Sequence, residues 1–261
     1  MTGSTRPVVL ITRPGVAGES LTRTLVGQGI DALWWPAFEI RLIADAAAEQ
    51  AIAALDQFEC VVLVSSAAAE GLAAVRIRQG ARTWPAGVAL AAVGASTLAA
   101  ARALFEPGPD VPVVAPTVAD DSAGAEALWP LLQQRAPRRV LIVRAAHGRE
   151  WLGERLRAAG SEVVYAAVYR RTPPTAMQAA ALVQALNDWQ RDHRTVVSVF
   201  SSSEAIEVVL TAAGRAAGAL RAGLAVATHT RIATQLQAVG FARVQVHPSS
   251  TLADALRSIE F

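Results

Sequence analysis

Short hydroxyl-bearing loops are the clearest candidates for chemistry in this sequence. Each follows an apolar run and opens a helical pattern. The residues concerned are Thr12 and Arg13, Ser65 and Ser66, Gly94 with Ser96 and Thr97, and Ser202 and Ser203. In open α/β sheets ligands gather at the carboxyl ends of strands, beside helix N-termini whose free N–H groups favour anions. These loops therefore predict a binding site for an anionic ligand. Simple capping of helix N-termini is the alternative for each serine.

The aromatic residues and the potential metal ligands give weaker indications of a functional site. Tyr165 and Tyr169 are the only tyrosines, and Tyr169 precedes two arginines and the Pro173-Pro174 break. We expect its ring to face a cleft; the alternative is a core tyrosine with a bonded hydroxyl. Trp34-Trp35 indicates packing. The single cysteine, Cys60, predicts a buried apolar residue, and no histidines show metal-ligand spacing, so no metal is expected.

Strong catalytic motifs are absent from the sequence. It contains no P-loop, no GxSxG and no HExxH pattern. With 52% hydrophobic and 18% charged residues and a net charge of +2, the 261-residue chain predicts a globular protein. Its basic residues are all arginine, a type suited to carboxylate contacts. No apolar run reaches the length of a membrane span and no signal core opens the chain, so we expect a cytoplasmic protein without membrane or nucleic-acid partners.

A duplicated α/β unit must position these loops. Residues 7–41 resemble residues 139–171, with Arg13 over Arg144 and Gly29 over Gly160. Two further pairs follow: 58–75 with 194–210, and 87–105 with 223–241. The copies lie 131 to 136 residues apart. Apolar strands alternate with helices in each copy, which predicts parallel sheets covered by helices on both faces.

The order of these blocks resembles the uroporphyrinogen-III synthase family over nearly the whole chain. The resemblance is carried by "VLITRP", "VVLVSSAAAEGL", "AAVGASTLAAA", "VLIVRAAHGREWLGERLRAAGSEVVYAAVYRR", "VFSSSEAIEVVL" and "ATHTRIATQLQAVGF". It implies two similar three-layer α/β domains joined by a two-stranded antiparallel connector, with a cleft between them. One domain is discontinuous, residues 1–37 plus 173–261, and residues 38–170 form the other.

The reaction that the resemblance implies is cyclisation of hydroxymethylbilane to uroporphyrinogen III, with loss of water and inversion of ring D. It implies no cofactor and a linear, polycarboxylate tetrapyrrole as the partner, bound by a monomer. The substrate cyclises unaided to the wrong isomer, so the family chiefly supplies geometry. A non-catalytic two-lobed anion binder remains the alternative, and a two-lobed glycosyltransferase is a weaker one.

Individual roles also follow from the resemblance. Tyr169 matches the family's proposed proton donor, and Thr97 matches its Gly-x-x-Thr loop. The resemblance places Ser65, Ser66, Ser202 and Ser203 towards the substrate, and Arg13, Arg144 or Arg149 against its carboxylates. Arg149 has a helix-end carboxylate as its alternative partner. The second Gly-x-x-Thr loop departs from the pattern: His229 replaces the glycine and Arg231 the threonine. His229 is expected to contact the ligand or to cap its helix.

Overall fold

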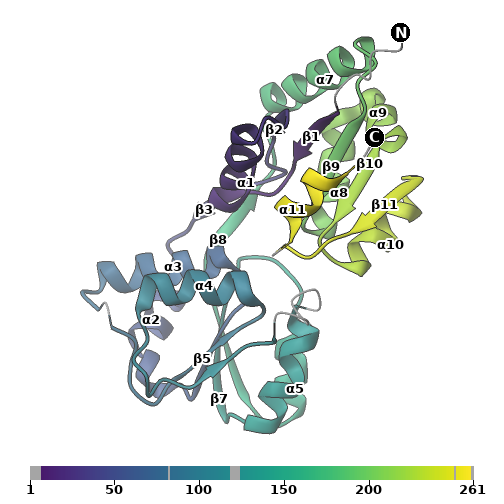
Figure 1. Ribbon diagram of the computed structural model, residues 1–261. Coiled ribbons are helices and arrows are strands. Elements are labelled where there is room, and N and C mark those ends of the chain that lie inside the picture. Colours follow the sequence, from purple (N-terminus) through teal and green to yellow (C-terminus); the bar gives the residue numbers. More distant parts are fainter. Residues whose placement is uncertain (1–6, 82, 118–123, 250, 260–261) are drawn as a thin grey trace. The chain divides into compact units, whose positions relative to one another are not determined.

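The computed structural model describes residues 7–81, 83–117, 124–249 and 251–259, which fold into two compact units (Figure 1). Unit 1 comprises Met1–Glu39 and Thr172–Phe261, and unit 2 comprises Ile40–Arg171. The boundaries predicted at residues 37 and 173 lie close to these limits. The predicted division of the chain into two domains stays a prediction.

Unit 1 contains one parallel sheet, sheet A, with strand order β11-β10-β9-β1-β2. Its elements are β1 (Val8–Ile11), α1 (Gly15–Gly27), β2 (Ala32–Trp34), α7 (Ala176–Arg191), β9 (Val196–Phe200), α8 (Ser203–Ala213), a 3-10 turn (Gly214–Ala216), α9 (Ala217–Ala222), β10 (Leu224–Ala227), α10 (Thr230–Ala238), β11 (Arg243–Val246) and α11 (Leu252–Ser258).

Helices cover both faces of sheet A, because its central strands are apolar on both sides. Val9 and Ile11 of β1 pack with Leu25 of α1 and with α11. Val8 and Leu10 point to the other face, where α7, α8, α9 and α10 supply the contacts. Successive strand residues point to opposite faces, so a continuous apolar run predicts a strand buried on both sides. The prediction of a three-layer unit is confirmed here.

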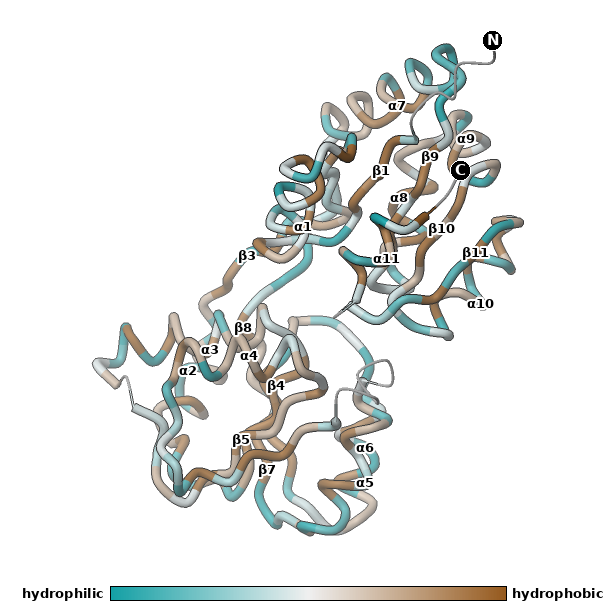
Figure 2. Tube along the Cα trace, in the orientation of Figure 1, coloured by the Kyte–Doolittle hydropathy of each residue, from teal (hydrophilic) through white to brown (hydrophobic). Residues whose placement is uncertain are grey.

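Unit 2 repeats this architecture around sheet B, in the order β3-β8-β7-β4-β5-β6. Its elements are β3 (Glu39–Leu42), α2 (Ala46–Ala53), a 3-10 turn (Leu55–Gln57), β4 (Cys60–Leu63), α3 (Ser66–Arg78), β5 (Ala89–Ala92), α4 (Ala95–Phe105), β6 (Val113–Val114), α5 (Ala125–Arg135), β7 (Arg139–Ala145), α6 (Trp151–Ala158) and β8 (Glu162–Thr172). Helices α2, α3 and α4 cover one face and α5 and α6 the other. Figure 2 shows the hydrophobic strands enclosed by more polar helices.

The two sheets share one topology with different starting points. Strand by strand, β2-β1-β9-β10-β11 corresponds to β8-β7-β4-β5-β6. Numbered along the chain, the strands of sheet A follow the doubly wound order 2-1-3-4-5. In unit 2 the chain enters the same arrangement at the strand equivalent to number 3, which is β4. The three predicted repeat pairs are confirmed as β1-α1-β2 with β7-α6-β8, β9-α8 with β4-α3, and β10-α10 with β5-α4. Each unit thus combines segments from both copies.

The chain passes from unit 1 to unit 2 within β3 and returns within β8. These two strands are neighbours in sheet B, and Ile43 N–H donates to Val168 O at 3.1 Å just beyond β3. Strand β8 ends at Thr172, directly before Pro173-Pro174, as the sequence predicts, because proline lacks the N–H that a central strand needs. Among the described residues, no helix is both long enough and apolar enough to cross a membrane.

Candidate functional site

The candidate residues lie at the carboxyl edges of the two sheets, with Arg144 and Tyr169 inside the strands β7 and β8. In unit 2, Ser65 follows β4, Gly94 follows β5, and residues 146–150 follow β7. Strands β4 and β7 are neighbours, yet their helices α3 and α6 lie on opposite faces of sheet B. This is the point where the strand order reverses, and ligands of doubly wound sheets bind outside the strand ends there. In unit 1 the corresponding point lies between β1 and β9.

Tyr169 is buried within unit 2. The residue is 1% exposed and belongs to the core formed with α2, α3 and α4. Within unit 2 this burial matches the alternative of a core tyrosine with a bonded hydroxyl, and the expected position of the ring against a cleft stays a prediction. The Tyr169 hydroxyl lies 3.0 Å from Ser65 Oγ. Ser65 is half-buried and caps α3, accepting from Ala68 N–H at 3.1 Å. The buried Tyr169 hydroxyl is therefore connected to the edge of sheet B by its contact with Ser65.

The loop after β5 places its three predicted residues in different settings. Gly94 is the N-cap of α4, Ser96 is exposed, and Thr97 is buried. The carbonyl of Ser96 accepts from Ser66 Oγ at 3.4 Å, so the β4 and β5 loops are in contact. Ser66, the first residue of α3, thus connects the starts of the neighbouring helices α3 and α4.

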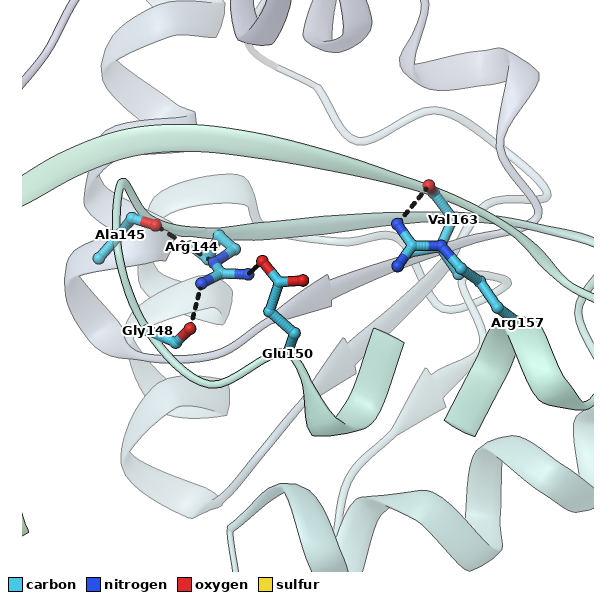
Figure 3. A network of polar contacts seen from close by, with 6 residues as sticks. All are labelled: Arg144, Ala145, Gly148, Glu150, Arg157 and Val163. Carbon is cyan, nitrogen blue, oxygen red and sulfur yellow. Dashed lines mark hydrogen bonds and ion pairs between the residues drawn. The ribbon is translucent and has the colours of Figure 1, made fainter. Parts of the chain in front are cut away.

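Arg144 turns its guanidinium back onto its own loop (Figure 3). Its side chain is only 10% exposed. The group donates to the carbonyls of Ala145 and Gly148, at 3.2 and 2.6 Å, and to Glu150 Oε1 at 3.4 Å. It also lies 4.9 Å from the ring centroid of Tyr165. The sequence predicted that Arg144 contacts substrate carboxylates. Instead, all three of its side-chain nitrogens donate hydrogen bonds to residues of its own loop.

Arg149 takes the alternative partner that the sequence suggested. Its guanidinium donates to Glu126 Oε1 at 2.5 Å, in the first turn of α5. Both side chains are about half exposed, so water screens this ion pair. Arg149 also lies 6.0 Å from the ring centroid of Trp151. A role for Arg149 in binding carboxylates remains a prediction.

At the edge of sheet A, Thr12 has a structural role. It is fully buried, and its hydroxyl donates to Val199 O at 2.5 Å, which joins the ends of β1 and β9. Arg13 is half-buried, and its carbonyl accepts from Trp34 Nε1 at 2.9 Å. The predicted ligand contact of Thr12 would require its hydroxyl to leave the Val199 carbonyl, and the contacts predicted for Thr12 and Arg13 stay predictions.

The serines after β9 repeat the arrangement after β4. Ser202 caps α8 by accepting from Ala205 N–H at 3.2 Å, as Ser65 caps α3. Both serines therefore cap a helix, and their predicted contacts with substrate stay predictions. Ser203 opens α8, and its Oγ is buried without a hydrogen-bond partner among the described residues.

His229 caps α10, which was one of its two predicted roles. Its Nδ1 accepts from Arg231 N–H at 2.9 Å. Gly94 and His229 are both N-caps, so Thr97 corresponds to Ile232 and Arg231 to Ser96. The assignment of Arg231 to the threonine position is therefore wrong by one residue. Thr97 and Ile232 are both buried, at 4% and 3% exposure, as the equivalence requires.

Two aromatic residues near the sheet edges were treated as packing in the sequence. Trp34 donates to the Arg13 carbonyl, and Tyr165 faces Arg144. Each is matched by a helical glycine: a Cβ on Gly18 would lie 2.8 Å from Trp34 Nε1, and one on Gly153 2.0 Å from the Tyr165 hydroxyl. Trp34 and Tyr165 both follow the repeated glycines by five residues, and this spacing could have revealed the pair.

Cys60 and the metal-binding residue types do not form a second site within the part of the chain that the structure describes. Burial raises the pKa of the Cys60 thiol from 9.0 to about 12, with smaller opposing effects of Arg135 and Glu59. A thiol that stays protonated is a poor nucleophile and metal ligand. No cluster of three or more metal-ligating side chains occurs among these described residues.

The fold and its edges define a class: two doubly wound α/β units with hydroxyl-bearing loops at the carboxyl ends of their strands. The chain belongs to the uroporphyrinogen-III synthase family, because the family model described as uroporphyrinogen-III synthase HemD matches residues 19–257. It is 33% identical over 171 residues to a uroporphyrinogen-III synthase of Salmonella typhimurium. That alignment covers 62% of this chain and 64% of the relative, which is less than two thirds of its length.

Solved structures share the fold at low sequence identity. A mutant uroporphyrinogen III synthase of Thermus thermophilus aligns with a TM-score of 0.61 and 17% identity, covering 97% of this chain and 98% of that one. A uroporphyrinogen-III synthetase of Helicobacter pylori gives 0.55 and 14%, covering 97% and 100%. At such identities the likeness concerns the fold alone.

Proposed function

We propose that this chain cyclises hydroxymethylbilane to uroporphyrinogen III, with loss of water and inversion of ring D. The observation that carries the proposal is the family match over residues 19–257. The candidate residues at the carboxyl edges of both sheets support it, because polar loops at helix starts suit a polycarboxylate.

The reaction places modest demands on acid–base chemistry. The hydroxyl of the hydroxymethyl group leaves as water after accepting one proton, and the pyrrole nitrogens stabilise the methylene cation that remains. The substituted carbon of ring D then attacks this cation, giving a spiro intermediate that rearranges to the inverted ring. Holding ring D in that geometry is the main task, and orientation alone can account for several kcal/mol of selectivity.

Tyr169 is proposed to act through Ser65. The tyrosine hydroxyl is buried, and its neighbour at 3.0 Å is Ser65 Oγ at the sheet edge. A proton passes from the phenol to Ser65 Oγ as the serine proton passes to the departing hydroxyl group. General acid catalysis requires such hydrogen-bond reach at each transfer. The half-buried Ser65 is then the residue that touches substrate.

The substrate carboxylates are proposed to bind at the helix starts and nearby arginines. Ser65 and Ser202 already occupy the N–H groups of Ala68 and Ala205. The N–H groups of Ser66 and Ala67 in α3 and of Ser203 in α8 precede these and suit a carboxylate. Arg13 and Arg149 are proposed to add charge-assisted contacts.

The setting of the reaction is part of the proposal. We infer a monomer that works in the cytoplasm without a metal or organic cofactor. Light scattering during gel filtration tests the oligomeric state, and activity after exhaustive chelation and dialysis tests the cofactor claim. A dimer, or a loss of activity that a metal restores, would contradict the respective part.

A coupled assay tests the proposed activity. Hydroxymethylbilane is generated in situ by its own synthase and mixed with this protein, and the products are oxidised and separated as uroporphyrin isomers. Mostly isomer III is expected. Mostly isomer I, as in the control without this protein, would reject the proposed activity. Binding of the tetrapyrrole without a change in isomer ratio would instead support the anion-binder alternative.

A further inference from the structure

Arg144 occupies an unusual position for an arginine at a sheet edge. It is the last residue but one of β7, and its side chain is 10% exposed. Its hydrogen-bond acceptors, Ala145 O, Gly148 O and Glu150 Oε1, all lie in the segment that follows it (Figure 3). A guanidinium presents several donors in a rigid plane, so it can hold three acceptors of one loop in a fixed arrangement.

The aromatic ring of Tyr165 supports the Arg144 guanidinium. The Cζ atoms of Arg144 and Arg157 lie 4.9 and 5.0 Å from its centroid. The Tyr165 hydroxyl is buried without a hydrogen-bond partner in the described part of the chain. Burying a hydroxyl without a hydrogen bond destabilises a protein. The favourable contacts of Tyr165 with the two arginines are therefore made by its ring. Gly153 on α6 leaves space for the hydroxyl end of this side chain.

The loop that Arg144 holds is connected to Tyr169. A bulge between Arg144 and Ala145 brings Ala145 opposite Tyr169 in the pairing of β7 with β8. Ala146 N–H then donates to Tyr169 O at 2.8 Å. The same tyrosine contacts Ser65 through its hydroxyl at 3.0 Å. The position of the loop therefore bears directly on the backbone of the residue proposed as proton donor.

We propose that Arg144 is a positioning residue and does not itself bind substrate. Its guanidinium holds the Ala145–Glu150 segment at the point where the strand order of sheet B reverses, and through the Ala146–Tyr169 bond it keeps Tyr169 in place against Ser65. This inference rests on the proposed synthase function for its kinetic consequences. The structural part, the fixing of the loop, stands on the contacts alone.

Arg157 offers a matched control. It stacks on the same Tyr165 ring and donates to one carbonyl, Val163 O, at 3.4 Å. It lies in the second half of α6, and its hydrogen bond in Figure 3 runs to β8 and not to the loop. Arg157→Met therefore removes a comparable stacking contact without releasing the loop.

The experiment compares Arg144→Met, Arg144→Lys and Arg157→Met by steady-state kinetics and by hydrogen exchange of the Ala146 amide. For Arg144→Met we expect kcat/KM to fall about tenfold, with most of the change in kcat because Tyr169 is misplaced, and Ala146 exchange to accelerate about tenfold. Arg144→Lys should stay close to Arg144→Met, because an ammonium cannot span three acceptors. Arg157→Met should remain within about twofold of the wild type in both measurements.

Several outcomes would overturn the proposal. A folded Arg144→Met variant with reduced affinity but unchanged Ala146 exchange would make Arg144 a substrate ligand. Equal effects of Arg157→Met would assign them to packing around Tyr165. If Arg144→Met does not fold, the kinetics and the Ala146 exchange of Arg144→Lys are compared with the wild type in the same way. If the wild type forms no isomer III, the proposed function fails, and the exchange data alone still decide the positioning claim.

Discussion

The segments β1-α1-β2 and β7-α6-β8 are two versions of one unit, and they stabilise the loop after the first strand differently. Each has an arginine at or just beyond the end of that strand, an aromatic residue on the second strand and a glycine on the helix. In unit 1 the short loop Thr12–Pro14 is held by a bond from Trp34 Nε1 to the Arg13 carbonyl. In unit 2 the longer loop Ala146–Glu150 is held by the Arg144 side chain, which lies over the Tyr165 ring.

The difference follows from loop length. A single bond between a side chain and a main-chain carbonyl is enough for a short turn, because strand and helix already fix both its ends. A longer loop has more conformations to lose, so more contacts are needed to order it. The arginine at the repeated position therefore takes part through its carbonyl in unit 1 and through its guanidinium in unit 2.

The largest expected effect comes from the two matched glycines. A Cβ on Gly18 would lie 1.9 Å from the Arg13 carbonyl oxygen, which is backbone, whereas one on Gly153 meets the movable Tyr165 side chain. We expect Gly18→Ala to lower the free energy of unfolding by about 3 kcal/mol and Gly153→Ala by about 1 kcal/mol. Urea denaturation measures both.

Gly27→Ala is the control for these glycines, because its Cβ would meet nothing within 4 Å. Alanine favours a helix, so this change should not lower stability. Adding Tyr165→Phe should recover part of the loss in Gly153→Ala. Equal losses in Gly18→Ala and Gly153→Ala would contradict the proposed difference between the two units.

The next largest effect concerns Tyr169. In the described part of unit 1, no tyrosine contacts Ser202 as Tyr169 contacts Ser65 in unit 2. Tyr169→Phe removes the contact with Ser65 Oγ and keeps the buried ring. We expect kcat to fall about tenfold while the protein remains folded, since the leaving group needs only modest assistance. Isomer-resolved kinetics measure this. An unchanged rate in the folded variant would remove Tyr169 from the mechanism.

The two capping serines allow a comparison at equivalent positions. Ser65→Ala and Ser202→Ala each remove one N-cap bond, so each should lower the unfolding free energy by about 1 kcal/mol. Only Ser65 also contacts Tyr169. We therefore expect Ser65→Ala to reduce kcat several-fold more than Ser202→Ala does. Thermal unfolding and kcat are measured on the same preparations, and equal kcat values would contradict the relay through Ser65.

The smallest effect concerns Cys60, whose place in the pairing of unit 1 is taken by Val197. Burial raises the pKa of Cys60 from 9.0 to about 12. The folded state keeps a proton that the unfolded state loses, so this contribution is complete below pH 9 and is lost as the pH rises towards 12. At pH 9.5 the loss should stay below about 1 kcal/mol.

Cys60→Val tests this linkage by giving unit 2 the residue type of unit 1. The variant should lose less stability than the wild type between pH 8 and pH 9.5, as measured by urea denaturation. At pH 7 the native thiol should resist iodoacetamide until the protein unfolds. Rapid alkylation of folded protein would show that Cys60 is accessible and that its pKa is not raised.

Much of the fold was predictable from local sequence patterns. The alternation of apolar runs and helical periods predicted parallel sheets with helices on both faces, and the repeated glycines marked the helix ends before Gly29 and Gly160. Loops with Ser65, Gly94 and Ser202 were expected at helix starts, where they lie. These features depend on residues close in sequence, so one copy of the unit suffices to specify them.

The tertiary structure decided which side chains are available at the sheet edges. Tyr169 is buried because β8 pairs with β7 and α3 covers it, and Thr12 is bonded to Val199, a residue far along the chain. Arg144 turns inward because Tyr165 and its own loop surround it. The equivalence of Thr97 with Ile232 likewise required the caps Gly94 and His229. Composition and spacing place a side chain on a loop, but contacts between distant segments determine its direction and its partners.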